Sequence, residues 1–543
     1  MVWDLPTFRQ CRFFFYFSEC EFIMVIYCND KIYTMSENRE TVTAFAASDD
    51  GIIRATGERE ELKGIYPDAR VEELEGECVI PGIIDTHAHL FMVADSEADR
   101  EMLIPLNLED LFSDIRRRVK SEPEGTWIAY PNTYPLRLDE LRYPTLAELD
   151  EIAPKHPVSI DGFYSAQVNS AALNALDLSK LPPGGKVILS DSGAMTGTLL
   201  NCNAILSPHY IKRTKTALTQ AIKNALAGYS AMGITTTVEA ISNTDGMAAV
   251  AELAKKGEQN VRVRYTQMLP RGTDYVELIK KARSIDCVDE NLARLIMCKK
   301  TVDGGILTGT SYMEDEYNEI EGIFGLVNIG DDWRGNLVTD VDELEEGIYA
   351  AQRAGLSFGA HCVGSGASEK LLRAFERVNE REPIAKYRHA LMHADFMNKS
   401  QLKRAADIGV CIHFQPAWHY MDAPFVERIA GKSEMDRFMP YADIAQSGVK
   451  AGAGSDHMAK YHPDLSCNPY NPYTGLYNMV TCKARDGKAY GEHQRISRDK
   501  ALAYYTCDAA WVISDEKLTG SLEVGKRADF AVLNNDYFTC AQD

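Results

Sequence analysis

Two histidines stand one residue apart in the segment VIPGIIDTHAHLF, residues 79–91. If this apolar run forms a strand, His87 and His89 point to the same face of it, because side chains alternate along a strand. Two neutral imidazoles that converge in this way can bind a divalent metal ion. The alternative is a pair of histidines that form hydrogen bonds at the edge of a sheet, and an isolated His-x-His motif does not separate the two.

Short apolar runs alternate with helical patterns along the chain, beginning with the run that carries His87. The eight runs cover residues 79–89, 233–240, 261–268, 293–300, 356–362, 388–395, 409–416 and 449–457. Strands that alternate with helices predict βαβ units and a parallel sheet. Eight such strands predict the α/β fold class and a closed (β/α)8 barrel of the TIM type.

Metal-binding and acid–base side chains gather at the carboxyl ends of these runs, where barrel enzymes hold their active sites. These residues are His87, His89, Lys299 or Lys300, His361, His393 and Asp456. Five of the eight runs end on such a residue, although the whole chain has only 12 histidines. We therefore expect one site at this end of the barrel, which favours the metal-binding interpretation of the first two histidines.

Segments outside the eight runs predict further domains. Residues 25–84 and 506–543 contain short strands and turn-forming pairs such as Asp-Gly, and we expect them to form one small composite β-sandwich. The interval 96–210 is too long for a loop and predicts an inserted α+β subdomain over the barrel mouth. The barrel itself is expected to span residues 85–505. Residues 1–24 form an N-terminal extension, of which 1–23 are expected to pack poorly.

Composition limits the partners of this chain. Among 543 residues, 79 are acidic and 58 basic, so the net charge of −21 repels phosphate backbones and we expect no nucleic acid partner. No apolar stretch is long enough to span a membrane. The 13 cysteines are scattered without a CxxC pair, which predicts reduced thiols in a cytoplasmic protein. The sequence leaves the oligomeric state open, with a homodimer as one option.

A series of motifs spread from about residue 25 to 540 carries a family resemblance. In chain order they are PGIIDTHAH, TLAELDEIAPKHPV, VNSAAL, KTVDGG, GAHCVGSGA, RHALMH, FQPAWHYMD, AGSDH and GSLEVGKRADFAVL. Together they resemble the metal-dependent amidohydrolase superfamily, and within it the amidohydrolase family 3 branch, which includes N-substituted formamide deformylases. Any one of these motifs alone would be weak support, but their order and spread make the resemblance specific.

The resemblance implies a role for each strand-end residue. It implies that a divalent metal, most simply Zn2+ as one ion or two, is held by His87, His89, Lys299, His361, His393 and Asp456. In relatives the lysine of the fourth strand can be carboxylated and bridge two metals. Lys299 has the family spacing from Asp303, whereas the adjacent Lys300 would point to the opposite face of the strand.

Four positions depart from the family pattern. Ser365 replaces an acid, Met392 replaces a glutamate, and Tyr164 stands where a histidine is frequent. His457 follows the Gly-Ser-Asp motif in place of an apolar residue. None of these changes removes an implied metal ligand, so they affect the expected substrate pocket rather than the metal centre.

The expected reaction is hydrolysis of a carbon–nitrogen bond in a small molecule. Asp456 would take a proton from water and pass it to the leaving amine, with His393 as a metal ligand or a donor to the carbonyl oxygen. Four residues are expected to contact the substrate, namely Tyr164, Trp418, His419 and His457. Many rings and few cationic groups predict a neutral amide or formamide with an aryl or alkyl substituent. A deaminase or cyclic-amide hydrolase is the alternative, and an inactive metal-binding protein that binds a ligand or partner is a more distant one.

Overall fold

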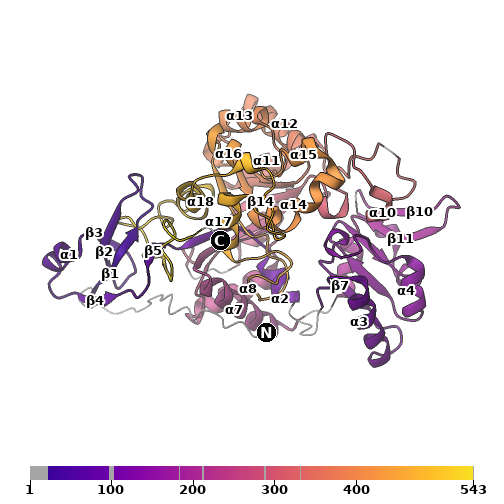
Figure 1. Cartoon of the computed structure of the whole chain (residues 1–543), viewed down its shortest axis with the longest axis horizontal. Helices are drawn as coiled ribbons and strands as arrows, with labels where there is room; N and C mark the ends of the chain where they lie inside the picture. The colour runs from indigo at the N-terminus through magenta and orange to yellow at the C-terminus, as the bar shows by residue number, and fades with distance from the viewer. Residues whose placement is uncertain are drawn as a thin grey trace.

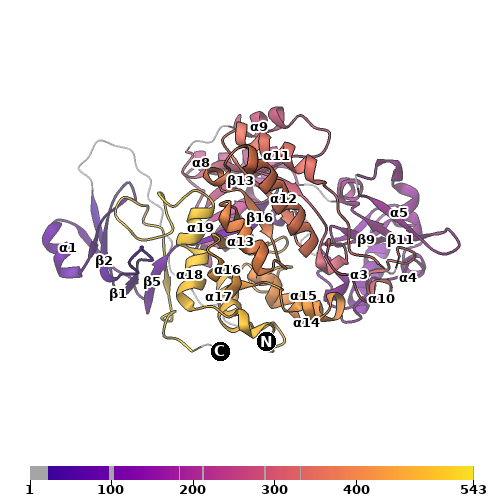
Figure 2. The same cartoon turned by 90° about the horizontal axis from the view of Figure 1, so that it is seen from above.

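The computed structural model describes residues 23–96, 103–182, 184–210, 213–285, 289–330 and 332–541. The predicted N-terminal extension lies outside the described residues, apart from its last two. Three parts follow one another across the molecule in Figures 1 and 2: a small sheet domain, a central barrel and a second domain on the far side of the barrel.

The central part is a barrel of parallel strands, as predicted. In the described chain its eight strands are β6 (Ile83–Ala88), β12 (Ile234–Glu239), β13 (Arg262–Met268), β14 (Ala293–Thr301), β15 (Ser357–Cys362), β16 (Ala390–His393), β17 (Cys411–Phe414) and β18 (Ala451–Ala453). Neighbouring strands pair in parallel in this order. The first and last strands meet just beyond their ends, where the amide of Asp456 donates to the carbonyl of His87 over 2.7 Å and the amide of His89 donates to that of His457 over 2.9 Å. The fold is a TIM-type barrel.

Helices surround the barrel strands in Figure 2. They are α7 (Lys215–Ala231), α8 (Thr244–Lys255), α9 (Tyr275–Arg283), α11 (Val341–Arg353), α12 (Ser365–Arg381), α13 (Lys399–Asp407), α14 (Pro416–Ala430), α15 (Lys432–Met435), α16 (Tyr441–Ser447), α17 (Pro472–Thr481), α18 (Arg498–Tyr505) and α19 (Cys507–Val512). Several begin at a side chain that accepts a hydrogen bond from the first turn, as Thr214 does for α7 and Asp340 for α11. Such caps fix where each helix starts relative to the strand before it.

The first predicted strand is divided in the structure. Its first half is β5 (Cys78–Pro81), which belongs to the sheet of the small domain, and its second half is β6. The chain passes from one sheet to the other at Gly82, where a Cβ atom would lie 2.2 Å from Oγ1 of Thr235. Only glycine allows this close approach of the two barrel strands.

Strands from both ends of the chain form the small sheet domain. The described strands β1 (Met24–Tyr33), β2 (Thr41–Ser48), β3 (Ile53–Gly57) and β4 (Arg70–Glu73) join β5 and β19 (Phe530–Leu533) in one six-stranded sheet. The C-terminal β19 runs antiparallel to β5, with Phe530 opposite Pro81. Helix α1 (Arg59–Ile65) packs on this sheet through Leu62. A sandwich form of this domain stays a prediction.

The interval after β6 contains a sheet of its own. In the described residues its strand order is β10 (Lys186–Leu189), β11 (Met195–Leu200), β9 (Ser165–Val168), β8 (Val158–Asp161) and β7 (Ile128–Pro131). Helices α3 (Leu108–Ser121), α4 (Leu146–Ile152) and α5 (Ser170–Ala175) accompany these strands (Figures 1 and 2). A buried cluster around Leu111, Tyr130 and Ile160 gives part of this insertion its own core. The exact domain boundaries stay predictions.

Two findings concern the environment of the chain. No helix in the described part of the chain combines the length and the hydropathy that a membrane crossing requires. The cysteines placed in the structure are free thiols, and most of them are buried.

Candidate metal centre

Three side chains at the carboxyl end of the barrel form a cluster that can hold a metal ion. His87 and His89 come from the end of β6, and Asp456 lies three residues after β18. One ligand atom of each lies within 4.8 Å of those of the other two, and all three residues are buried. Oδ1 of Asp456 is 3.0 Å from Nε2 of His89 and 3.4 Å from Nε2 of His87. Two imidazole nitrogens and a carboxylate oxygen are a donor set that suits Zn2+.

The atoms of this cluster fit a metal because the described residues leave some of them without a hydrogen bond. Despite its proximity to His89, Oδ1 of Asp456 has no hydrogen-bond partner of suitable geometry among the described residues. Burial raises the pKa of Asp456, but contact with His89 and the nearby charges of His393 and Lys299 outweigh it and lower the pKa below its ordinary value. Burial lowers the pKa of both His87 and His89, which keeps them neutral as metal ligands must be.

His393 lies beside this cluster at the end of β16. Its ring centroid is 4.8 Å from that of His87. Its Nδ1 donates to Oε1 of Gln415 over 2.7 Å, and its buried Nε2 has no partner within the described residues. His393 and Asp456 both have left-handed backbone conformations, with φ of 73° and 53°. Such strain in non-glycine residues is concentrated at functional sites.

His361, from the end of β15, lies beside His393, with ring centroids 4.4 Å apart. Its Nε2 donates to the carbonyl of Gly304 over 3.0 Å, and its Nδ1 accepts from the hydroxyl of Tyr164 over 3.1 Å. The predicted ligand is therefore near the cluster, but both ring nitrogens have protein partners in this arrangement. Either Tyr164 or the carbonyl of Gly304 would have to release its ring nitrogen before His361 could bind a metal.

The two adjacent lysines of β14 point in opposite directions. Nζ of Lys299 lies 3.3 Å from Nε2 of His87, and burial lowers the pKa of this lysine to about 8. Nζ of Lys300 donates to Oε1 of Glu343 on α11 over 2.6 Å and lies over the ring of Tyr275. Geometry thus places Lys299 in the cluster and Lys300 on the outside of the barrel.

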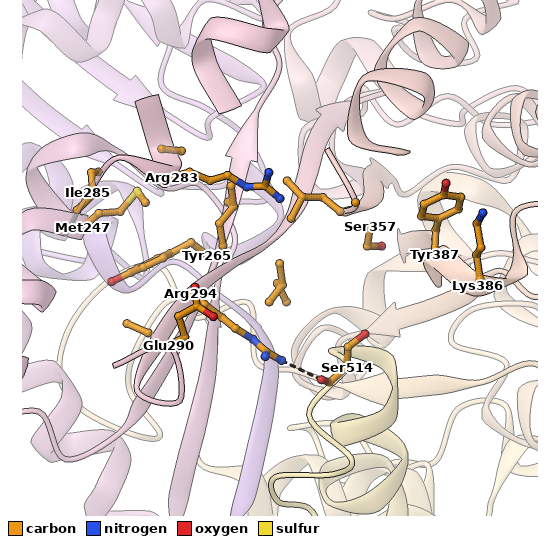
Figure 3. A pocket seen from close by; sticks show the side chains of 16 residues that line it. Met247, Tyr265, Arg283, Ile285, Glu290, Arg294, Ser357, Lys386, Tyr387 and Ser514 are labelled. Atoms are coloured by element: carbon orange, nitrogen blue, oxygen red, sulfur yellow. Dashed lines mark hydrogen bonds between the residues drawn. The ribbon is translucent and has the colours of Figure 1, made fainter. Parts of the chain in front are cut away.

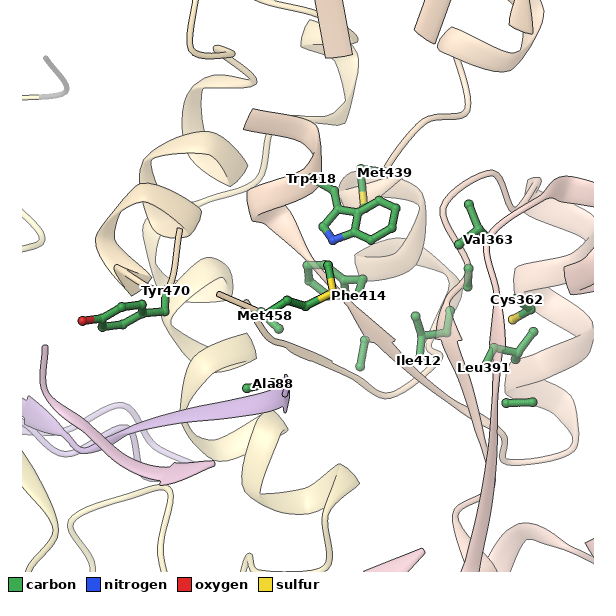
Figure 4. Close-up of a cluster of buried hydrophobic side chains, with 14 of the residues drawn as sticks. Ala88, Cys362, Val363, Leu391, Ile412, Phe414, Trp418, Met439, Met458 and Tyr470 are labelled. Atoms are coloured by element: carbon green, nitrogen blue, oxygen red, sulfur yellow. The ribbon is translucent and has the colours of Figure 1, made fainter. Parts of the chain in front are cut away.

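The four predicted substrate-contacting residues have different surroundings. Tyr164 lies on His361, and Trp418 donates its indole N–H to Oδ2 of Asp456 over 3.0 Å. His457 accepts from the hydroxyl of Tyr229 and donates to a backbone carbonyl, so it offers a substrate no ring nitrogen. His419 accepts at Nδ1 from an asparagine of α17 and stacks on a phenylalanine ring. The indole of Trp418 sits in a buried apolar cluster in Figure 4, near Met439 and Met458 in the view.

Three residues of the site were not predicted from the sequence. Glu239 ends β12, and its carboxylate accepts the amides of Phe91 and Ile241; burial raises its pKa to about 8. Its position as the last residue of a barrel strand was a usable signal. Gln415, which orients His393, and Asn468, which donates to Asp456, lie in loops and gave no comparable signal.

Two departures from the family pattern lie outside the cluster. Met392 is fully buried and belongs to an apolar cluster with Met297. Oγ of Ser365 donates to Oε1 of Glu434 over 3.2 Å, so an acid from α15 lies at this position.

A separate cavity of about 530 Å³ opens at the opposite end of the barrel strands (Figure 3). Its lining includes Ala293 and Arg294 at the start of β14, Ser357 at the start of β15, and Arg283 at the end of α9. The metal cluster lies at the other ends of these strands. This cavity is therefore not the place where a substrate would meet His87 and Asp456.

Comparison with known proteins agrees with this geometry. The family model described as "Amidohydrolase family" matches residues 70–543. The chain belongs to the amidohydrolase family. It is a hydrolase of carbon–nitrogen bonds other than peptide bonds.

Several full-length relatives of this amidohydrolase are known. The protein YtcJ of Bacillus subtilis (strain 168) is 25% identical over 537 residues, which cover 93% of each chain. The N-substituted formamide deformylase of Arthrobacter pascens is 25% identical over 506 residues, 90% of each chain. A solved structure of an uncharacterized metal-dependent hydrolase from Pyrococcus horikoshii OT3 has a TM-score of 0.70 at 20% identity and covers 96% of this chain and 99% of its own. This last likeness supports the fold.

Proposed function

We propose that this amidohydrolase is metal-dependent and hydrolyses the C–N bond of a small, neutral N-substituted amide or formamide. The observation that carries the proposal is the carboxylate of Asp456, with one oxygen directed at His87 and His89 and free of hydrogen bonds within the described chain. A buried, ionised carboxylate oxygen that has no hydrogen bond and lies beside two imidazole nitrogens suits a bound cation. Amide hydrolysis at such a site requires a cation to activate water and a carboxylate to accept the proton.

His87, His89 and Asp456 would hold the first ion, which is Zn2+ on the basis of two imidazoles and one carboxylate. His393 can add its Nε2, which has no hydrogen-bond partner among the described residues. A second ion would also need Lys299 in carboxylated form. When bound, such a cation supplies Lewis acidity, which lowers the pKa of a water molecule to about 7 and polarises a carbonyl group.

The protein's own residues then move one proton. The carboxylate of Asp456 is the group that can accept it from water. The same carboxyl group passes the proton to the amine nitrogen as the C–N bond breaks, so water and amide give an amine and a carboxylic acid. Gln415 fixes the tautomer of His393 by accepting from Nδ1. Nε2 of the neutral ring therefore carries the lone pair, which suits a metal ligand rather than a donor to the carbonyl oxygen.

The substrate class follows from the aromatic residues of the insertion. Tyr164 packs on His361, and Phe163 lies against Tyr164 with ring centroids 4.9 Å apart. Aromatic rings beside a metal centre suit an aryl or alkyl substituent, whereas an anionic substrate would need arginine side chains to bind it. The name of the Arthrobacter pascens relative, an N-substituted formamide deformylase, agrees with this class.

The proposal is tested with the purified full chain. Formamides and amides with aryl or alkyl substituents, cyclic amides and aminopurines are offered in turn, and the metal content is measured. We expect turnover of the neutral N-substituted amides and about one or two zinc ions per chain. Turnover of aminopurines alone would instead identify a deaminase, and metal binding without turnover of any compound would identify a binding protein.

Variants identify the ligands. His87→Ala and His89→Ala should each lose bound metal and activity while the barrel stays folded, because each removes one of three ligands. His493→Ala is the matched control, since His493 is exposed and outside the cluster. Full zinc occupancy in both ligand variants would rule out this metal centre.

A further inference from the structure

The second carboxylate oxygen of Asp456 has two donors that the proposed reaction does not yet use. Nε1 of Trp418 donates to Oδ2 over 3.0 Å. Nδ2 of Asn468 lies 3.4 Å from the same oxygen and donates to the backbone carbonyl of Asp456 over 2.6 Å. All three residues are buried. These contacts fix the rotation of the carboxylate and leave Oδ1 directed at His87 and His89.

The orientation of the Asn468 amide is fixed by a guanidinium group from the insertion. Nη2 of Arg137 donates to Oδ1 of Asn468 over 3.0 Å. An amide whose oxygen accepts on one side must present its NH2 group on the other, which here faces Asp456. Arg137 also donates to the carbonyl of Cys467, the residue before Asn468. The loop that carries the amide is thus held from the insertion.

The same guanidinium group holds the helix that carries Trp418. Nε and Nη2 of Arg137 donate to the two oxygens of Asp422 over 3.0 and 2.9 Å, as a buried bidentate pair. Asp422 and Trp418 are four residues apart on α14 and therefore share one face of the helix. Arg137 lies in the short helix η1 (Pro135–Arg137) of the insertion, between β7 and α4. One insertion residue therefore anchors both elements that supply donors to Asp456.

We propose that Trp418 and Asn468 are positioning residues that orient the Asp456 carboxylate toward the metal ligands, and that Arg137 of the insertion holds both of them in place. This rests on the proposed function of Asp456 as metal ligand and base. It assigns Trp418 a role different from substrate contact. It also gives the insertion a part in building the metal centre in addition to lining the pocket.

Donors to Oδ2 matter for the metal site because an unrestrained carboxylate can adopt several orientations. Without donors on Oδ2, the group can turn about its side-chain bond and bring either oxygen, or neither, toward the histidines. Residues that orient a metal ligand typically contribute 10- to 100-fold to metal affinity or activity. They do so without touching the substrate, so KM changes little while kcat falls.

The experiment compares three variants for Co2+ affinity and for kcat and KM on the best amide found. Trp418→Phe keeps an aromatic ring and removes the N–H, and Asn468→Ala removes the amide. Arg137→Lys keeps the charge and removes the planar guanidinium that donates to several acceptors at once. We expect each to weaken Co2+ binding about 10-fold and to lower kcat about 10-fold, with KM within about twofold. Trp511→Phe is the control. Trp511 lies on α19, where its ring packs against Arg388 and not against Asp456.

Two other outcomes decide against the proposal. A raised KM with unchanged kcat and Co2+ affinity in Trp418→Phe would make Trp418 a substrate contact. Fully additive losses in Trp418→Phe combined with Asn468→Ala would mean that the two do not act on one oxygen. If the wild type binds Co2+ but hydrolyses no compound, the proposed function fails, and the Co2+ affinities alone still decide whether these residues orient Asp456. Circular dichroism of each variant excludes misfolding as the cause.

Discussion

Neighbouring residues of one barrel strand have different roles because their side chains point to opposite faces of the strand. Lys299 lies beside His87 in the cluster, and Lys300 forms an ion pair with Glu343 on a surrounding helix. Burial lowers the pKa of Lys299 to about 8, although the charges of Asp456 and Glu239 oppose this, so a neutral amine is accessible near physiological pH. A neutral amine is what reaction with carbon dioxide requires.

Lys299→Arg separates a bridging lysine from a bystander. Arginine stays protonated and cannot form the carbamate, so a two-ion centre should lose one ion per chain and most of its activity. Lys300→Arg should keep both, because arginine can also pair with Glu343. Elemental analysis of the purified chains measures the stoichiometry. The same metal content in the wild type and in Lys299→Arg would leave Lys299 without a bridging role.

The alternation of side chains along strands explains which site residues could be predicted from the sequence. His87, His89 and Lys299 follow from the position of each at a strand end. The donors to Oδ2 of Asp456 could not be foreseen, because Trp418 and Asn468 stand 38 and 12 residues away from it, and only the packing of helix α14 and of the loop after β18 brings them together.

At the scale of elements, β13 is fixed to the C-terminal part of the chain by buried arginines. Arg262 pairs with Asp529, and Arg264 pairs with Asp515, which also accepts from Arg294 of β14. Arg264 and Asp515 have fully buried side chains. These pairs join the barrel to the segment between α19 and β19, a connection that strand patterns alone do not reveal.

Asp515→Asn should destabilise the protein strongly. It leaves the buried charge of Arg264 without a counter-ion, and a broken buried pair costs about 3–5 kcal/mol in the free energy of unfolding. Urea denaturation measures the loss. Asp407→Asn is the control, since Asp407 pairs with Lys403 on the surface and should change stability by less than about 1 kcal/mol. Similar small changes in both variants would show that the buried pair is not structurally important.

Element boundaries show a second limit of sequence patterns. The apolar run 79–89 has the composition of one strand, yet β5 and β6 belong to different sheets. Both halves are buried, so the pattern carries no sign of the change of sheet. Only Pro81 and Gly82 mark the place, and the need for glycine there depends on Thr235 of the neighbouring strand.

At the scale of the whole molecule, the two ends of the described chain meet in the small sheet domain. Beyond the pairing of β19 with β5, Asp536 near the C-terminus accepts from Nζ of Lys31 over 2.8 Å and from the hydroxyl of Tyr33 over 2.9 Å. Both partners belong to β1. The pairing of the two ends was predicted from their strand and turn patterns, whereas this polar contact depends on a segment after β19 that has no regular pattern.

The contact of Asp536 with β1 should make the stability of the protein depend on pH in a defined direction. Burial raises the pKa of Asp536, but the hydrogen bonds from Lys31 and Tyr33 contribute to a net decrease from 3.8 to about 2. A carboxyl group with a lowered pKa in the folded state stabilises that state above pH 3.8, and the contribution is lost as the pH falls toward 2.

Since Lys31 is 45% exposed, solvent screening reduces the effect, and Asp536→Asn should lower the free energy of unfolding at pH 7 by about 1 kcal/mol. Urea denaturation of both proteins at pH 7, 5 and 3 tests this. The difference should be the same at pH 7 and 5 and smaller at pH 3, because part of Asp536 is then protonated in the unfolded state; a difference that stayed constant down to pH 3 would show that the loss comes from packing and not from the charge.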